Sequence, residues 1–143
     1  MRPLTYVCSA FTFFLLLFPI TPAQASSAIV ISQVYGGGGN AGATLKNDFV
    51  ELFNRSTATV SVDGWSIQYA SSAGSTWDRT TLSGSIPAGG FYLIALAAGA
   101  GGTANLPSAD ATGGSNLSAT TGKIALANNG VALSSVCLPI AGE

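Results

Sequence analysis

Short apolar stretches separated by turn-forming residues run along most of the chain. In residues 65–69 Trp, Ile and Tyr alternate with Ser and Gln, which is the period of a strand with one buried face. The Asp63-Gly64 pair before this stretch is a strong signal for a hairpin that joins residues 59–62 to residues 65–69. We predict strands at the following positions: 29–35, 49–53, 59–62, 65–69, 77–82, 91–96, 123–127 and 131–136.

The connections between these stretches are rich in glycine and small polar residues. Gly36 to Gly39 end the first strand and predict a flexible connection. Residues 97–122 are mostly Gly, Ala, Ser and Thr and predict one long loop. Asn128-Asn129-Gly130 suits a tight turn, so the last two strands should form a hairpin. Short strands at intervals of roughly 8–12 residues, with no helical pattern, predict an all-β antiparallel sandwich or barrel.

The first 25 residues have the pattern of a cleaved export signal. Arg2 supplies a positive start, residues 7–20 are apolar, and Ala23-Gln24-Ala25 is a cleavage pattern of small residues. The apolar core is shorter than the ~18 residues that a membrane-spanning helix needs. We therefore predict a signal peptide at 1–25, a mature domain at 26–143 that begins at Ser26, and no membrane span after cleavage.

Cleavage would leave Cys137 as the one cysteine of the mature chain. An odd cysteine in an exported protein indicates an intermolecular disulfide or a partner that is missing. Because Cys137 lies six residues from the end of the sequence, we expect the domain to be truncated at its C-terminus.

Composition and charge argue against several classes of function. The formal net charge is −1, with five Lys and Arg against six Asp and Glu, so no basic run could follow a phosphate backbone. Histidine is absent, which removes the commonest general base and the commonest transition-metal ligand. We predict no catalytic residues, no cofactor and no metal, and hence no enzyme.

Three stretches resemble the bacterial lamin-tail domain. They are residues 31–35 (ISQVY), 48–54 (DFVELFN) and 62–67 (VDGWSI). The turn at residues 87–89, followed by Phe-Tyr-Leu at 91–93, fits the same pattern. The resemblance extends from Ile29 to about Val136 and implies an immunoglobulin-like sandwich in a bacterial, secreted protein.

The resemblance also implies a place beside other domains, because such modules often precede extracellular nuclease or phosphoesterase domains. It carries over no active site. Gln33 stands where many members have Glu, so an acid is missing at that position. The chain also ends soon after Pro139, where the family usually continues.

The carboxylates nearest to a catalytic pair are Asp48 and Glu51. Residues three apart on a strand point to opposite faces, so we expect structural roles for both and no joint acid–base chemistry. Asp48, Glu51 and Asp110 could contribute oxygen ligands to calcium, but calcium needs about 6–8 of them and no Asp-rich loop occurs.

Other candidate features have plain structural interpretations. Gly36 to Gly39 lack the Lys-Ser/Thr pair and the helix of a phosphate-binding loop. Trp65, Trp77, Tyr69 and Tyr92 could form an aromatic platform for a sugar or a peptide. We predict that Trp65 is the core tryptophan of the sandwich and that Trp77 is exposed for contact.

These features favour a secreted, non-catalytic module that acts as a binding domain or as a spacer and is joined to a downstream domain of the same gene product. Its ligand could be a protein, a nucleic acid or a glycan. The alternative is the N-terminal part of an extracellular nuclease or phosphoesterase whose catalytic domain is missing. A third possibility is a structural protein that associates through unpaired strand edges.

Overall fold

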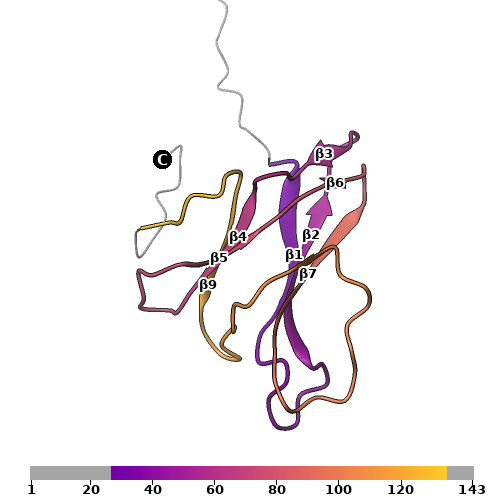
Figure 1. The fold of residues 1–143 in the computed structure, drawn as a ribbon. Helices are drawn as coiled ribbons and strands as arrows, with labels where there is room; N and C mark the ends of the chain where they lie inside the picture. Colours follow the sequence, from indigo (N-terminus) through magenta and orange to yellow (C-terminus); the bar gives the residue numbers. More distant parts are fainter. Residues whose placement is uncertain (1–26, 135–143) are drawn as a thin grey trace, which may run out of the picture.

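A computed structural model of the chain describes residues 27–134, and these residues form strands, turns and loops with no helix (Figure 1). Within them, no helix meets the length and apolarity needed to cross a bilayer. The strands are β1 (Ile29–Tyr35), β2 (Asn47–Asn54), β3 (Val60–Ser61), β4 (Ser66–Ala70), β5 (Asp78–Thr81), β6 (Ser85–Ile86), β7 (Phe91–Ala98), β8 (Ala111–Thr112) and β9 (Lys123–Ala127).

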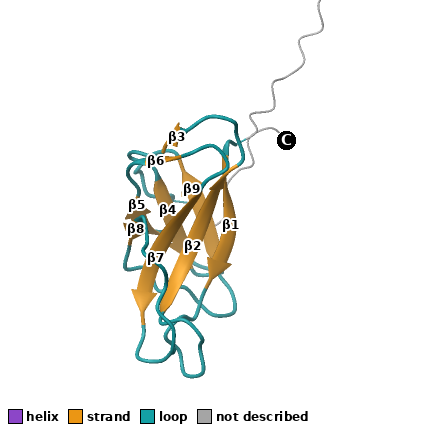
Figure 2. Ribbon diagram, turned by 90° about the vertical axis from the view of Figure 1, so that its right-hand side faces the viewer, coloured by secondary structure: helices purple, strands orange, loops and turns teal. Residues whose placement is uncertain are grey.

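Two sheets pack face to face as a sandwich, and Figure 2 shows β7, β2 and β1 side by side in the front layer. The larger sheet has the order β1-β2-β7-β8, and the smaller one has the order β5-β4-β9. A two-stranded β3-β6 pair lies at one end. Neighbouring strands are antiparallel except β7 and β8, which are parallel. The hairpin predicted across Asp63-Gly64 is wrong, because β3 pairs with β6 and β4 pairs with β5 and β9. The predicted all-β, immunoglobulin-like sandwich is confirmed.

Alternation along the strands builds the core. In β2 every second side chain, from Asp48 to Asn54, is buried, and β7 buries Tyr92, Ile94 and Leu96 in the same way. The apolar side chains among them, with Val50 and Leu52 from β2, meet Ile67 of β4 in one apolar cluster between the sheets. Burial of such side chains supplies the main driving force for the fold.

Tyr92 also links the core to a turn. Its hydroxyl donates a hydrogen bond of 2.8 Å to the carbonyl of Ser83, in the turn before β6. Burial raises the pKa of the Tyr92 hydroxyl above its ordinary value. The hydroxyl therefore stays protonated and available as a donor.

Two predictions about the second half of the chain are wrong. The long loop predicted at 97–122 contains β8, which pairs with the middle of β7. The predicted strand at 131–136 does not form a hairpin with β9, because residues 131–134 are not extended strand and β9 pairs with β4. Residues 135 and 136, like Cys137 and the predicted signal peptide at 1–25, lie outside the described residues.

Residues 129–133 instead cross the outer face of the β5-β4-β9 sheet. Gln68, with no exposed surface, donates to the carbonyl of Val131 at 2.7 Å and accepts from the N–H of Leu133 at 2.9 Å. Ser66 donates to the carbonyl of Asn129 at 2.7 Å. Both side chains form hydrogen bonds with the backbone of residues 129–133. These residues therefore cover the face of β4 that the alternating pattern predicts to be exposed to solvent.

The glycine run after β1, which the sequence predicts to be a flexible connection, is closely packed against neighbouring backbone. A Cβ at Gly38 would lie 2.1 Å from the carbonyl carbon of Asn47, which is closer than real Cβ atoms approach backbone. Gly39 has a φ of +73°, and a Cβ there would meet Gly99 at 2.2 Å. These glycines let the loop pack against β2 and against the loop after β7.

Candidate functional site

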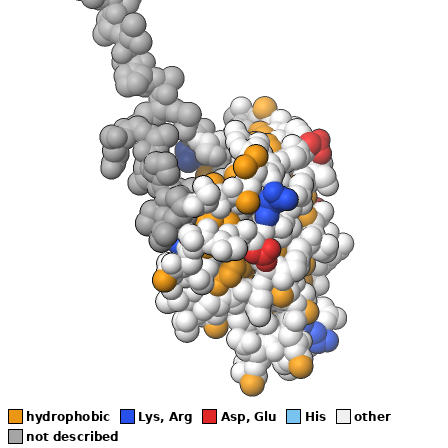
Figure 3. All heavy atoms as spheres, turned by 60° about the vertical axis from the view of Figure 1, so that its left-hand side comes forward, with side chains coloured by type: hydrophobic (Ala, Val, Ile, Leu, Met, Phe, Trp, Pro, Cys, Tyr) orange, Lys and Arg blue, Asp and Glu red, His pale blue; other side chains and the backbone are white. Residues whose placement is uncertain are grey.

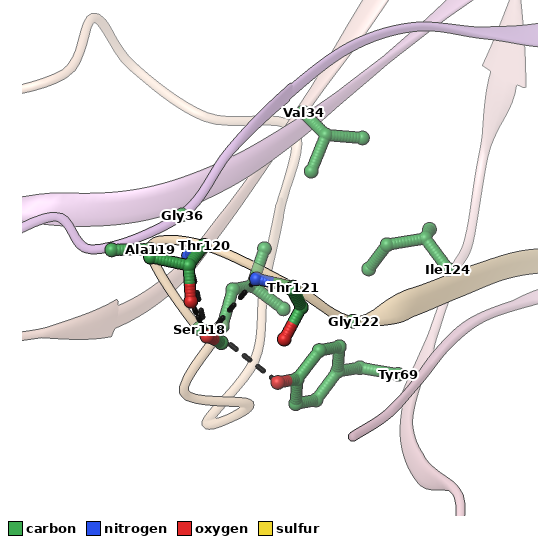
Figure 4. A pocket seen from close by; sticks show the side chains of 10 residues that line it. Val34, Gly36, Tyr69, Ser118, Ala119, Thr120, Thr121, Gly122 and Ile124 are labelled. Atoms are coloured by element: carbon green, nitrogen blue, oxygen red, sulfur yellow. Dashed lines mark hydrogen bonds between the residues drawn. The ribbon is translucent and has the colours of Figure 1, made fainter. Parts of the chain in front are cut away.

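A pocket of about 240 Å³ opens between the two sheets, at the side where β1 and β9 are the edge strands (Figure 4). We call it the seam pocket. Its lining consists of Val34, Gly36, Tyr69, Ile124 and residues 117–122. Figure 4 shows the side chains of Val34, Tyr69 and Ile124 around one hollow, together with the loop 117–122.

Strand register explains how three of these side chains meet. Tyr69 of β4 is directly opposite Ile124 of β9, so the two share a face of the smaller sheet. Val34 of β1 is opposite the buried Val50, which places Val34 on the inward side of the larger sheet. Val34 is nevertheless 50% exposed, because the sandwich is open at this side.

Hydrogen bonds fix the polar wall of the seam pocket. The N–H of Ser118 donates to the Tyr69 hydroxyl at 3.1 Å. The Ser118 hydroxyl accepts from the N–H groups of Thr120 and Thr121, each at 3.3 Å. The lining contains no Asp, Glu, Lys or Arg, so the pocket offers apolar surface and neutral hydroxyl groups. None of its side chains is one that commonly acts as a general acid or base near neutral pH.

Asp48 holds this wall in place from the interior. Its side chain has no exposed surface, and its two oxygens accept separate backbone bonds of 2.6 Å each, Oδ1 from Gly38 N–H and Oδ2 from Leu117 N–H. The carboxylate thereby joins the glycine run to the loop 117–122. This geometry supports the structural role that we expect for Asp48. The residue lies within β2, which begins two positions earlier than the predicted strand at 49–53.

The carboxylates of Glu51 and Asp110 have different hydrogen-bond partners from those of Asp48. Glu51 accepts a hydrogen bond of 2.7 Å from Ser32, on the opposite face of β2, and Asp110 accepts one of 2.8 Å from the N–H of Leu93. Across residues 27–134, no group of three His, Cys, Asp or Glu side chains is placed to hold a metal ion. The structure therefore does not bring the three calcium candidates together.

The predicted aromatic platform does not form. Trp65 is partly buried against the main core, as expected for a core side chain, and Tyr92 is buried. Trp77 is only 7% exposed, so its predicted exposure is wrong. It packs with Ala70, Ala125 and Leu133 on the outer face of the smaller sheet. Residues 129–133, which we call the C-terminal segment, cover this face.

Sequence reasoning missed two aromatic pairs on the outer face of the larger sheet. Tyr35 stacks on Phe49 with ring centroids 5.6 Å apart, and Phe53 contacts Phe91 at 4.9 Å. Phe91 is 60% exposed. The strand pairings put each pair in register across neighbouring strands, which cannot be known before the pairing partners are.

Charged side chains are scattered over the face of the molecule that Figure 3 draws, where the Lys and Arg side chains lie apart from one another and form no patch. A more open depression of about 560 Å³ near Trp77 has Asp78 as its charged lining residue. Neither this depression nor the seam pocket has Lys or Arg in its lining, so neither resembles the basic groove that a nucleic-acid backbone requires.

Comparison with known proteins gives one match. A family model described as Lamin Tail Domain matches residues 22–137, which is most of the chain. No curated protein and no solved structure matches the chain.

Proposed function

This chain belongs to the lamin tail domain family, and from that premise we propose that it is an exported, non-catalytic module that binds a neutral apolar group in the seam pocket. The observation that carries the proposal is the open pocket itself, which is framed by two sheets and lined without charge. The binding role goes beyond the family assignment and rests on this geometry.

Export is supported by the sequence before the domain. The apolar run at 7–20 precedes the family match, which starts at residue 22, and Ala23-Gln24-Ala25 lies just before the first described strand. We expect mass spectrometry of protein recovered outside the cytoplasm to find Ser26 as the first residue. Recovery of the chain from the membrane fraction with Met1 intact would contradict this.

The non-catalytic part of the proposal is supported by the separation of the acids. Asp48 is occupied by two backbone donors in the interior, and Glu51 faces the other side of β2. A nuclease or phosphoesterase mechanism needs carboxylates, metal ions or a base that converge on one phosphate. Under the alternative interpretation, in which the chain serves such an enzyme, residues 27–134 would contribute binding and not chemistry.

Binding in the seam pocket can be tested with a small neutral probe before any natural ligand is known. Isobutanol added to the ¹⁵N-labelled exported chain should shift the amide signals of Val34, Tyr69 and residues 117–124. The Val34→Asp substitution should abolish these shifts, because a charge at the rim disfavours an apolar occupant.

Phe91→Ser is the matched control, since Phe91 is an exposed apolar side chain outside the pocket lining. That variant should retain the shifts of the wild-type chain. Probe-induced shifts centred on Phe53 and Phe91 would instead place the binding surface on the outer face of the larger sheet and overturn the assignment to the seam pocket.

A further inference from the structure

We propose that the natural occupant of the seam pocket is one apolar side chain of an extended peptide, whose backbone pairs with the outer edge of β1, a strand edge that pairs with no other described strand. The inference rests on the proposed function and names its ligand class. Three observations support it: the size of the pocket, the unpaired strand edge beside it and the neutral lining.

The pocket is smaller than the sites that hold drug-sized ligands and cofactors. Sites for drug-sized ligands and cofactors enclose about 300–1,000 Å³ and cover most of the ligand surface. The seam pocket, at about 240 Å³, lies below that range and opens to solvent. It therefore fits one protruding group of a larger ligand.

The rim of the pocket is a strand edge. β1 is the outermost strand of its sheet, and among the described residues its one pairing partner is β2. The backbone groups on its other side can pair with an added strand, which is a recurring way in which proteins bind extended peptides. Because such an edge offers alternating backbone N–H and C=O groups, it favours a peptide ligand, whose own backbone can pair with them.

Strand geometry would bring the two contacts together. Val34 points inward but is half exposed, so a strand added beside β1 would place an inward side chain next to Val34 and over the pocket. The register of β1 is irregular between Ile31 and Gln33, where Ser32 bulges. The bulge limits regular pairing to the segment after it, Gln33 to Tyr35, so the recognised segment is short.

The lining determines the kind of side chain. Val34, Ile124 and the Tyr69 ring give apolar surface, and the loop adds Ser and Thr hydroxyl groups without charge. A valine, isoleucine or leucine side chain fits these walls, whereas a charged one would lose its hydration without a partner.

A peptide selection tests the proposal. A random twelve-residue phage library is first depleted on the Val34→Asp variant and then selected on the exported wild-type chain. We expect a consensus with apolar residues at alternating positions, and synthetic peptides that lose at least tenfold in affinity for Val34→Asp but not for Phe91→Ser. N-methylation of every second backbone amide of such a peptide should lower its affinity tenfold in one register and not in the other.

The other outcomes separate the two proposals. Isobutanol shifts at the pocket without any enriched peptide would keep the binding site and overturn the peptide ligand. A consensus with helical spacing, or N-methylation without effect in either register, would also overturn it. A wild-type dimer in sedimentation experiments that Val34→Asp dissociates would identify a second copy as the occupant. The absence of both isobutanol shifts and peptide binding would overturn the proposed function itself.

Discussion

Replacing Asp48 with Ala should lower the free energy of unfolding by about 3–5 kcal/mol. The substitution removes two hydrogen bonds of 2.6 Å and leaves the N–H groups of Gly38 and Leu117 without acceptors in the interior. A hydrogen bond to a charged group contributes about 1.5–3 kcal/mol, and an unsatisfied buried donor adds a desolvation cost. Urea denaturation of the two proteins, followed by tryptophan fluorescence, measures the difference.

Asp110→Ala is the matched control for this change. Asp110 also accepts a backbone hydrogen bond, from Leu93, but it lies at the surface, so water can replace the lost acceptor. Its loss should cost much less than that of Asp48. Asp48→Asn should fall between them, because the amide keeps one acceptor oxygen and turns its NH₂ group toward the other N–H. Equal denaturation midpoints for wild type and Asp48→Ala would show that Asp48 does not hold the loop 117–122.

The strands could be predicted from local sequence, because the alternation of apolar and polar residues that marks a strand lies within five to eight consecutive residues. The alternation in residues 65–69 correctly placed Ile67 and Tyr69 toward the core, and two predicted strands, 29–35 and 123–127, have the observed bounds. The short strand β8 escaped prediction because Ala111 and Thr112 carry no pattern of their own. Pairing with β7 is what makes them extended.

Long-range partners could not be predicted from a single sequence. Asp48 and Leu117 are 69 positions apart, and nothing near either residue indicates the bond between them. Gln68 and Ser66 look like solvent-facing positions of a half-buried strand, yet the C-terminal segment covers them. The seam pocket could not be predicted either, because its walls come from β1, β4, β9 and a loop, which are distant from one another in the sequence.

Removing the ring of Trp77 is the second large effect that we expect. The ring is 7% exposed and packs with Ala70 and Ala125, so Trp77→Ala should lower the free energy of unfolding by about 3–5 kcal/mol. Truncation also removes the contact with Lys123, whose Nζ lies 5.5 Å from the ring centroid. Ala70 and Ala125 are small and belong to paired strands, so the sheet itself cannot collapse to fill the space.

Trp65→Ala provides the comparison, because it removes the same number of atoms from a side chain that is only partly buried. We expect a smaller loss of stability at Trp65 than at Trp77, which is the reverse of the order that the sequence pattern predicts. Trp77→Phe should recover part of the loss, since it restores aromatic surface under Leu133. Urea denaturation followed by circular dichroism measures all three variants without relying on the tryptophan signal. A larger loss at Trp65 than at Trp77 would mean that the C-terminal segment does not cover the outer face of the β5-β4-β9 sheet in solution.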